Sequence, residues 1–580
     1  MSTARDRLHA PVVALLVVAL LAGSARAAAP SPAYGTRGMV VASEPQAARA
    51  GLAMLERGGN AVDAAIATAF ALAVTQPFSA GLGGGAFLLI RIADGQVIAL
   101  DARETAPAAA TRDMFVQPGV PERASLVGPL AVATPGFVAG CALALERWGT
   151  LPLAEVLAPA IALADRGFAI GRYHARMIEA MRSRGLAERF PETARIQFPP
   201  AGTPARPGWR LVQPELARVL LWIAGEEGPD VFYTGVIAEA IVEAVASRGG
   251  ILAREDLAAY RPVIREAITG SYRGHAIHSF PPPSSGGVAL VEALNILEGS
   301  ALAPLGAGSS ASVHRIAEAM KLAFADRAAY LGDPDFVPVP VAQLIAKPYA
   351  AELRARLDPA WWQRAPWLWL AGERAIRVAG PGLSQNDSGT THLSTSDAAG
   401  NAVALSMTIN TPFGSGITAE GTGVLLNNEM DDFAVATDVP NAYGLLDTRG
   451  ANAIAPGKRP LSSMTPTIVE KDGALLLVTG SPGGPRIIST TLLSVLNVID
   501  YGMDVSEAVS APRFHHQWQP DLLSVERAVP RDVVEALRER GHEVAVEEEN
   551  WSAAEAIAVD ADGAFWGGSD PRRDGLAAGF

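Results

Sequence analysis

A regular alternation of apolar and polar residues marks the stretch that follows residue 390. Between Ala402 and Asn410, apolar side chains occupy every second position and mostly polar ones the positions between. This period of two predicts a β-strand with one apolar and one polar face. The polar positions near its end are Ser406, Thr408 and Asn410. Just before it, the residues D-A-A-G-N at 397–401 predict a hairpin turn, which would fold Thr408 and Asn410 back toward a strand that begins at Thr390.

Further helices and strands are predicted on both sides of this hairpin. The expected helices are 45–56, with Ser43 as its N-cap and Gly58-Gly59 after its end, then 60–74, and a mostly helical region from 153 to 262. The expected strands are 87–90, 97–100 and 474–479, the last leading through a glycine-rich turn into a helix from Ile487. A chain of 580 residues is long enough for two domains or for one large layered domain.

Composition narrows the class of protein. Apolar residues make up 49% of the chain and charged residues 18%, as expected of a well-buried globular protein. The formal net charge is −13, from 47 basic and 60 acidic residues, which argues against a nucleic-acid partner. Cys141 is the single cysteine, so no internal disulfide can form, and its apolar helical surroundings predict a buried, unreactive thiol.

The first 27 residues have the pattern of an export signal. Arg5 and Arg7 precede an apolar run from Pro11 to Gly23, and Ala25-Arg26-Ala27 fits a small-x-small cleavage site. The apolar run is shorter than the roughly 20 residues that span a bilayer. We expect export to the periplasm or the medium and removal of residues 1–27, the alternative being an uncleaved anchor. No later stretch predicts a membrane span.

Two other patterns could suggest cofactors. Gly81-x-Gly83-x-x-Ala86 matches a dinucleotide-binding fingerprint in spacing, but it follows a predicted helix and precedes a predicted strand, the reverse of what that fingerprint requires. Its glycines more simply permit close backbone packing. The carboxylates at Asp333 and Asp335 have no His or Cys at ligand spacing, so we interpret them as turn residues. The sequence therefore implies no cofactor and no metal.

The step from Gly389 to Thr390 is the main candidate for chemistry. The preceding residues A-G-P-G-L-S-Q (379–385) predict an exposed, mobile loop. If the protein cuts its own Gly389–Thr390 bond, Thr390 becomes an N-terminal residue with a hydroxyl nucleophile and a nearby α-amine as base. The free amine has a pKa of roughly 7.7–8.0, so part of it is unprotonated near neutrality. The ordinary alternative is a Thr-Thr step entering a strand.

Two more places could bind an anionic group. Arg103 lies where a predicted buried strand ends, and its planar guanidinium suits a carboxylate, although a surface salt bridge is the simpler interpretation. The turn G-S-P-G-G-P-R at 480–486 precedes a helix, where the backbone N–H groups of Gly483 and Gly484 could stabilise an oxyanion. Turn geometry alone is the alternative.

These motifs together resemble the γ-glutamyltranspeptidases, a family of N-terminal nucleophile hydrolases. The likeness covers nearly the whole chain after the signal and is strongest over 390–432, P-L-S-S-M at 460–464 and G-S-P-G-G at 480–484. The resemblance implies an α+β fold, a four-layer αββα sandwich. It also implies a precursor that cleaves itself into a large subunit, 28–389, and a small subunit, 390–580, which together form one catalytic domain.

The resemblance also implies a role for each matching residue. Thr390 would be the nucleophile, Thr408 the hydroxyl that orients it, and Gly483 and Gly484 the oxyanion hole. The α-carboxylate of a γ-glutamyl group would be held by Arg103, Ser462 and Ser463, and its α-amine by Asn410, Glu429 and Asp432. Tyr443, within D-V-P-N-A-Y-G at 438–444, would gate the site as part of a lid. Glu429 stands where some bacterial members have Gln, and residues other than glycine also occur in the family at position 389.

The implied activity is acyl transfer without a cofactor. Thr390 would attack the γ-glutamyl amide of glutathione or a related compound, and the resulting ester would pass to water or to the amine of an amino acid or dipeptide. One rival is a cephalosporin or glutaryl acylase of the same architecture, whose substrates lack the α-amine. A second rival, from another class, is an exported binding protein that never cleaves itself.

Overall fold

The computed structural model describes residues 29–356, 389–437 and 439–580. The export signal and the 379–385 loop expected from the sequence lie outside these residues. The described part is a mixed α/β structure whose two large sheets are antiparallel and have seven strands each. Three smaller sheets are β5–β6 (Phe168–Ala169, Arg210–Leu211), β12–β13 (Thr418–Ala419, Val424–Leu425) and β16–β17–β18 (Phe514–His515, Leu523–Glu526, Val544–Glu547).

The first large sheet contains Thr390. Its strands, in spatial order, are β21 (Leu576–Gly579), β2 (Gly38–Ala42), β10 (Gly389–Asp397), β11 (Ala402–Asn410), β3 (Gly85–Arg91), β4 (Val97–Ala102) and β7 (Val263–Glu266). The second sheet has the order β1 (Ala33–Gly35), β20 (Phe565–Ser569), β19 (Glu555–Val559), β15 (Ala474–Gly480), β14 (Thr467–Lys471), β9 (His275–Ser279) and β8 (Ile268–Tyr272).

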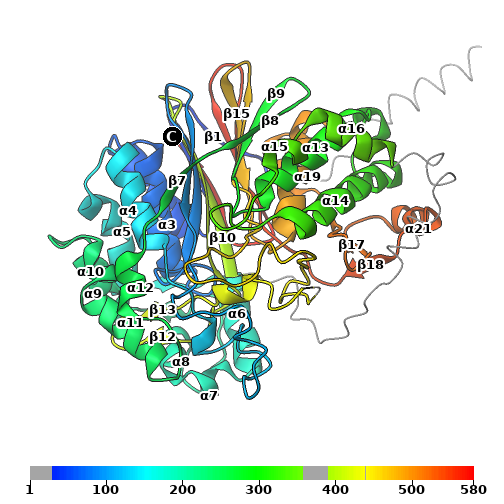
Figure 1. Cartoon of the computed structure of the whole chain (residues 1–580). Coiled ribbons are helices and arrows are strands. Elements are labelled where there is room, and N and C mark those ends of the chain that lie inside the picture. The colour runs from blue at the N-terminus through cyan, green and yellow to red at the C-terminus, as the bar shows by residue number, and fades with distance from the viewer. Residues whose placement is uncertain (1–28, 357–388, 438) are drawn as a thin grey trace, which may run out of the picture.

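The two sheets pack face to face, and helices cover their outer faces (Figure 1). On the first sheet lie α2 (Pro45–Glu56), α3 (Ala61–Thr75) and α4 (Phe137–Trp148), and α5 (Leu153–Arg166) packs against α3. Below these helices in Figure 1 lie α6 (Arg172–Ser183), α7 (Leu186–Arg189), α8 (Pro191–Gln197), α9 (Pro214–Ile223), α10 (Asp230–Tyr233), α11 (Val236–Ala246) and α12 (Arg254–Ala259). On the second side lie α13 (Gly286–Glu298), α14 (Ser310–Tyr330), α15 (Val341–Leu344), α16 (Lys347–Ala355), α19 (Arg486–Ile499), α20 (Val505–Ser510) and α21 (Arg531–Glu539). Short 3₁₀ turns are Pro129–Ala131, Ala303–Leu305 and Glu429–Asp432.

Three apolar clusters hold these layers together. One joins the first sheet to its helices and includes the apolar face of β11, with Val403, Leu405 and Met407. A second fills the space between the sheets, where Phe87 stacks on Phe280 at 4.1 Å. A third joins the second sheet to α13, α14 and α19. The two faces of β11 therefore pack against different layers, as its alternation predicts. Val403 faces the helices and Ala404 faces the other sheet.

The hairpin predicted from the sequence is confirmed. β10 and β11 pair antiparallel with Thr390 opposite Thr408 and Gly389 opposite Asn410, and the register is irregular between Gly389 and Thr390. Asn410 has a positive φ of 73° at this irregularity, a conformation that asparagine tolerates better than most residues. The beginning of β10 and the end of β11 therefore meet where the candidate nucleophile lies.

The first helix differs from the prediction at its start. Glu44, not Ser43, is the N-cap of α2, and its carboxylate accepts a hydrogen bond from Ala47 N at 2.9 Å. The Ser43 hydroxyl instead donates to Gln76 Oε1 at 3.0 Å. The following helix α3 begins as expected, with Asn60 and Asp63 forming a capping box.

The glycines at 83 and 84 serve close packing, as the sequence predicts. A Cβ on Gly83 would lie 2.3 Å from Leu425 O, and one on Gly84 would lie 2.0 Å from Thr408 O. Both distances are far inside van der Waals contact, so the backbone can pass here only without side chains. Among the described residues, no helix combines the length and the apolar character needed to cross a bilayer.

Candidate active site

Thr390 lies at the beginning of a central strand with its hydroxyl against Thr408. The two Oγ atoms are 3.0 Å apart, and Thr408 Oγ donates to Gly389 O at 2.8 Å. Because Thr408 gives its single proton to Gly389 O, the proton in the Thr390–Thr408 bond belongs to Thr390. Thr408 Oγ also accepts from Asn410 N at 2.8 Å, which fixes its position. Thr408 is therefore placed to align the Thr390 hydroxyl and to polarise the carbonyl before it.

A small pocket, open in part to solvent, adjoins Thr390. The pocket is lined by Arg103, Thr390, Thr408, Asn410, Glu429, Asp432, Tyr443, Leu445, Leu461, Ser462, Ser463, Met464, Gly484 and Ile487. We call it the Thr390 pocket. All the side chains predicted to bind the substrate line this pocket, namely Arg103, Asn410, Glu429, Asp432, Ser462 and Ser463. Gly484 of the predicted oxyanion hole also lines it, whereas Gly483 does not.

A group of buried charges occupies one side of the Thr390 pocket. Arg103 pairs through Nη1 with Glu429, and through Nη2 with Asp432 Oδ2 at 2.5 Å. Its Nη1 also lies 3.7 Å from Glu104, and its Nε donates to Pro460 O at 3.0 Å. Arg103 is completely buried, so the surface salt-bridge interpretation is wrong. The group has three carboxylates and one guanidinium, so it carries excess negative charge whenever the acids are ionised.

Burial controls the protonation of these acids. It raises the pKa of Glu104 to about 7 and that of Glu429 well above its usual value, in both cases against the lowering effect of Arg103. Burial also raises the pKa of Asp432. No described group hydrogen-bonds to Glu429 Oε2 or to either oxygen of Glu104. A cationic ligand entering the pocket would compensate these carboxylates, because buried charge without a partner is costly.

The remaining polar side chains are held in place by the loops around the pocket. Asn410 Nδ2 donates to Asn428 O at 2.9 Å. Its Oδ1 is the amide's acceptor atom, suited to a ligand donor. Ser462 O accepts from Ser285 N at 2.8 Å, and Ser462 Oγ accepts from Met464 N at 3.1 Å. Ser462 and Ser463 are both buried at the pocket wall.

The two glycines before α19 have backbones that other residues rarely adopt. Gly483 has φ of 135° and Gly484 has φ of 57°. The Gly483 carbonyl accepts from Arg486 N at 3.1 Å within the first turn of α19. The N–H of Gly484 belongs to the same trans peptide and points the opposite way, out of the helix start. Such an N–H suits a developing negative charge on a ligand oxygen.

Tyr443 lines the Thr390 pocket. Its hydroxyl donates to Asn410 O at 2.6 Å, and its backbone carbonyl accepts from Gln517 Nε2 at 3.1 Å. Its ring lies so close to Gly484 that a Cβ there would be 2.7 Å from Tyr443 Cδ1. The side chain is only 8% exposed. Together with the bond from Ala442 N to Asp431 Oδ2 at 3.1 Å, these contacts hold Tyr443 in the wall of the pocket.

Two residues near the site were missed by the sequence analysis. Glu104 is fully buried beside Arg103. Arg573 donates through Nη1 to Thr390 O at 3.2 Å and stacks over the ring of Tyr173 at 4.5 Å. Glu104 could have been found from the sequence, because it directly follows Arg103 at the end of a predicted buried strand. Arg573 lies 183 residues from Thr390 and has no local signal.

Comparisons with known proteins agree with this geometry. The family model described as Gamma-glutamyltranspeptidase matches residues 47–580. The chain is 47% identical to the Glutathione hydrolase proenzyme of Escherichia coli (strain K12), over 97% of this chain and 98% of that protein.

Two solved structures are similar as well. The cephalosporin acylase from Bacillus halodurans has a TM-score of 0.80 and 30% identity, over 96% of this chain and 98% of that one. A chain of the Helicobacter pylori gamma-glutamyltranspeptidase has a TM-score of 0.53 and 42% identity, over 55% of this chain and 90% of that one. By the family match and the identity over nearly its whole length, the chain belongs to the γ-glutamyltranspeptidase family.

Proposed function

We propose that the protein is a self-cleaving γ-glutamyl hydrolase and transferase acting on glutathione and related γ-glutamyl compounds. The observation that carries this proposal is the position of the Thr390 hydroxyl, 3.0 Å from Thr408 Oγ, at the edge of a pocket with buried charges of both signs. Family membership and the 47% identity to a glutathione hydrolase proenzyme support it. The two facing sheets with outer helices are compatible with a four-layer αββα sandwich of the N-terminal nucleophile type.

The first proposed step is maturation of the precursor. Thr390 Oγ attacks the Gly389 carbonyl carbon, which Thr408 polarises by its hydrogen bond. The Gly389–Thr390 C–N bond breaks, the α-amine is released, and water hydrolyses the resulting ester to leave the Gly389 carboxylate. The products are a large subunit, 28–389 after removal of the signal 1–27, and a small subunit, 390–580. The separate Helicobacter pylori chain, which covers 55% of this one, supports such a division.

The second proposed step is acyl transfer. The freed α-amine takes the proton of Thr390 Oγ, which attacks the γ-carbonyl carbon of the substrate. The N–H groups of Gly483 and Gly484 stabilise the oxyanion, and the leaving amine takes the proton as the C–N bond breaks. Water or the amine of an amino acid or dipeptide then attacks the γ-glutamyl ester and restores Thr390. Closure of Tyr443 over the pocket limits access of bulk water.

The charges of the Thr390 pocket support a γ-glutamyl rather than a glutaryl substrate. A γ-glutamyl group has an ammonium and a carboxylate at the end remote from the amide. Asn410, Glu429 and Asp432 would hold the ammonium, while Arg103, Ser462 and Ser463 would hold the carboxylate. The similarity to a cephalosporin acylase keeps the acylase as the second candidate, but a glutaryl group would leave the surplus carboxylates without a cation.

A gel and a sequencing run test the maturation. Purified protein should give two bands, and N-terminal sequencing of the lighter band should begin at Thr390-Thr391-His392. A single uncleaved band from active protein would contradict the proposal, and a single uncleaved band without activity would favour a binding protein. N-terminal sequencing of the heavier band from exported protein tests the expected signal boundary after Ala27.

Removing Asp432 tests the substrate class. In Asp432→Asn the substrate ammonium loses an ionic partner, a loss of about 1.5–3 kcal/mol for a charged hydrogen bond. We therefore expect the KM for γ-glutamyl-p-nitroanilide to rise by roughly 10- to 150-fold. The matched control is glutaryl-p-nitroanilide, which lacks the ammonium and should be affected less than threefold. Equal effects on both substrates would argue against ammonium binding at Asp432.

Replacing Gly389 tests why a glycine precedes the nucleophile. A Cβ at this position would lie 2.3 Å from Thr411 O, a backbone atom that cannot move aside independently. We expect Gly389→Ala to displace the scissile carbonyl from Thr408 and to slow maturation at least about tenfold in a gel time course. Because Gly389 ends the large subunit after cleavage, activity per mole of matured enzyme should stay within about twofold. Maturation at the original rate would refute this account.

A further inference from the structure

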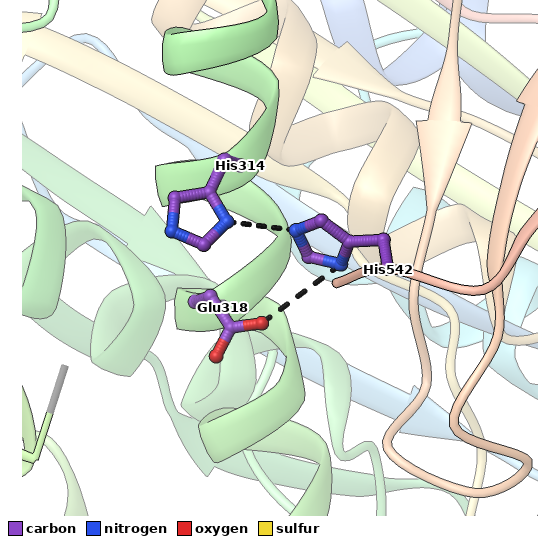
Figure 2. A group of neighbouring side chains, drawn as sticks. All are labelled: His314, Glu318 and His542. Atoms are coloured by element: carbon purple, nitrogen blue, oxygen red, sulfur yellow. Dashed lines mark hydrogen bonds and ion pairs between the residues drawn. The ribbon is translucent and has the colours of Figure 1, made fainter. Parts of the chain in front are cut away.

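A second group of potential ligands lies on the helical layer that covers the other sheet. His314 and Glu318 are four residues apart on α14 and so lie on the same face of the helix. His542 follows α21, where Gly541 has a φ of 94° and His542 N donates to Leu537 O at 3.2 Å. Figure 2 shows the two imidazole rings pointing toward each other, with the Glu318 carboxylate beside them. None of these residues lines the Thr390 pocket.

The distances between these side chains are close to those of a metal site. His314 Nδ1 lies 2.7 Å from His542 Nε2. The Glu318 carboxylate lies beside the same ring, with Oε1 4.0 Å from the other ring nitrogen, Nδ1. One ligand atom from each residue can be chosen so that all lie within 4.8 Å of one another. Nitrogen ligands at about 2.0–2.1 Å from a tetrahedral Zn²⁺ are roughly 3.3 Å apart. The two rings would therefore have to separate by only about 0.6 Å to admit an ion.

The surroundings favour ligation by nitrogen. An imidazole in its neutral form has one ring nitrogen with a lone pair that can bind a metal ion. Lys321 Nζ lies 3.2 Å from Glu318 Oε1 but also 2.8 Å from Asp521 Oδ1. Lys321 thus keeps an ionic partner when Glu318 turns to a metal. Two imidazoles and a single carboxylate do not suit Ca²⁺ or Mg²⁺, which take mostly oxygen ligands.

We propose that His314, Glu318 and His542 bind one divalent transition-metal ion of the Zn²⁺ type, with water completing its coordination. His542 is 9% exposed, and its partners on α14 are partly exposed, so an ion can reach the group from solvent. The ion would join α14 to the chain between α21 and β18, segments more than 200 residues apart in the sequence. The site lies outside the catalytic pocket and does not depend on the proposed function. Its expected effect is greater stability of this layer.

Zinc titration of tag-free, chelator-stripped protein tests the proposal. Zn²⁺ alone, in competition with a chromophoric chelator, should bind at one equivalent per chain with a dissociation constant in the micromolar range or below, and should raise Tm. Co²⁺ in place of Zn²⁺ should give visible absorption bands. His542→Gln and Glu318→Gln should each weaken this binding at least about tenfold and lose the Tm increase, while γ-glutamyl activity stays within about twofold.

The matched control is His278→Gln. His278 forms a pair with Glu470, with 3.1 Å between Nε2 and Oε2, and belongs to no described three-ligand group. This variant should bind Zn²⁺ as the unaltered protein does. The proposal fails if the unaltered protein shows no saturable equivalent, or if His542→Gln and Glu318→Gln bind Zn²⁺ with unchanged affinity. Because the first of these outcomes uses the unaltered protein, a variant that misfolds does not decide the matter.

Discussion

Thr390→Ala is expected to leave the chain unbroken and to lower kcat/KM for γ-glutamyl-p-nitroanilide by roughly 10⁴- to 10⁶-fold. The substitution removes the hydroxyl that lies 3.0 Å from Thr408 Oγ and that is proposed to attack both the Gly389 carbonyl and the substrate. Without cleavage no α-amine is freed, so the nucleophile and its base are lost together. A gel, N-terminal sequencing and a rate assay on the same preparation measure both effects.

Two neighbouring variants show whether the loss is specific. Thr391→Ala removes the adjacent hydroxyl, which lies 2.5 Å from Ser43 Oγ and away from Thr408, so this variant should still mature and turn over substrate. Thr390→Ser keeps a hydroxyl at the reacting position and should restore cleavage and part of the rate. If Thr390→Ala protein were cleaved and active, or if Thr391→Ala lost both properties instead, the assignment of the nucleophile would be wrong.

Arg103→Leu is expected to have the largest effect on stability. The change leaves Glu104, Glu429 and Asp432 buried without their shared cation. Breaking a buried ion pair by removing one partner costs about 3–5 kcal/mol. We therefore expect the free energy of unfolding to fall by that amount at pH 8, with a lower Tm and no measurable γ-glutamyl activity. Chemical denaturation and calorimetry measure the loss.

The stability deficit of Arg103→Leu should depend on pH. A carboxyl group whose pKa is raised by folding binds its proton more tightly in the folded state, so its contribution to stability is present at low pH and is lost as pH rises through the folded value. For Glu104 that interval runs from about 4.5 to about 7. Because Arg103 lowers the pKa of Glu104 and of Glu429, its removal should raise both pKa values further. The deficit should therefore be smaller at pH 5 than at pH 8.

Arg195 offers a matched control on the surface. It also pairs with two carboxylates, Glu192 at 2.7 Å and Glu215 at 2.8 Å, but its side chain is 54% exposed. Surface ion pairs contribute about 0–1 kcal/mol, so Arg195→Leu should change the free energy of unfolding by no more than that. Equal losses in the two variants, or a deficit in Arg103→Leu that does not vary with pH, would refute the account of the buried charges.

Local patterns predicted the hairpin well because its information is contained in one stretch. The alternation in β11 determines which of its side chains face the helices. The turn at 397–401 sets the antiparallel register in which Thr408 lies opposite Thr390. The cap of α2 was predicted one residue early because Ser and Glu side chains can both reach the first helical N–H groups, and Ser43 has partners from distant segments at Gln76 and Thr391.

Residues of the site could be predicted only where they belong to a recognisable sequence motif. Arg103, Glu429 and Asp432 were placed by family resemblance, and no spacing in the sequence could show that they pair directly with one another. The hydrogen bond from Arg573 to Thr390 O forms because β21, near the C-terminus, pairs with β2, near the N-terminus. The His314–His542 contact is of the same kind. Such contacts follow from topology, which local periodicity does not encode.

Each large sheet contains strands from both fragments, 28–389 and 390–580, that the proposed cleavage would produce. In the first, β2, β3, β4 and β7 come from the part before Thr390, while β10, β11 and β21 belong to the later part. In the second, β1 pairs with β20 and β9 pairs with β14, so strands of the earlier part again lie beside strands of the later part. Neither fragment alone would have a complete sheet to fold upon. If the chain is cut as proposed, synthesis as one polypeptide would let both sheets form before cleavage, and separately synthesised fragments mixed afterwards should fail to reconstitute the enzyme. Hydrolysis of the peptide link would remove a tether that the finished particle no longer needs.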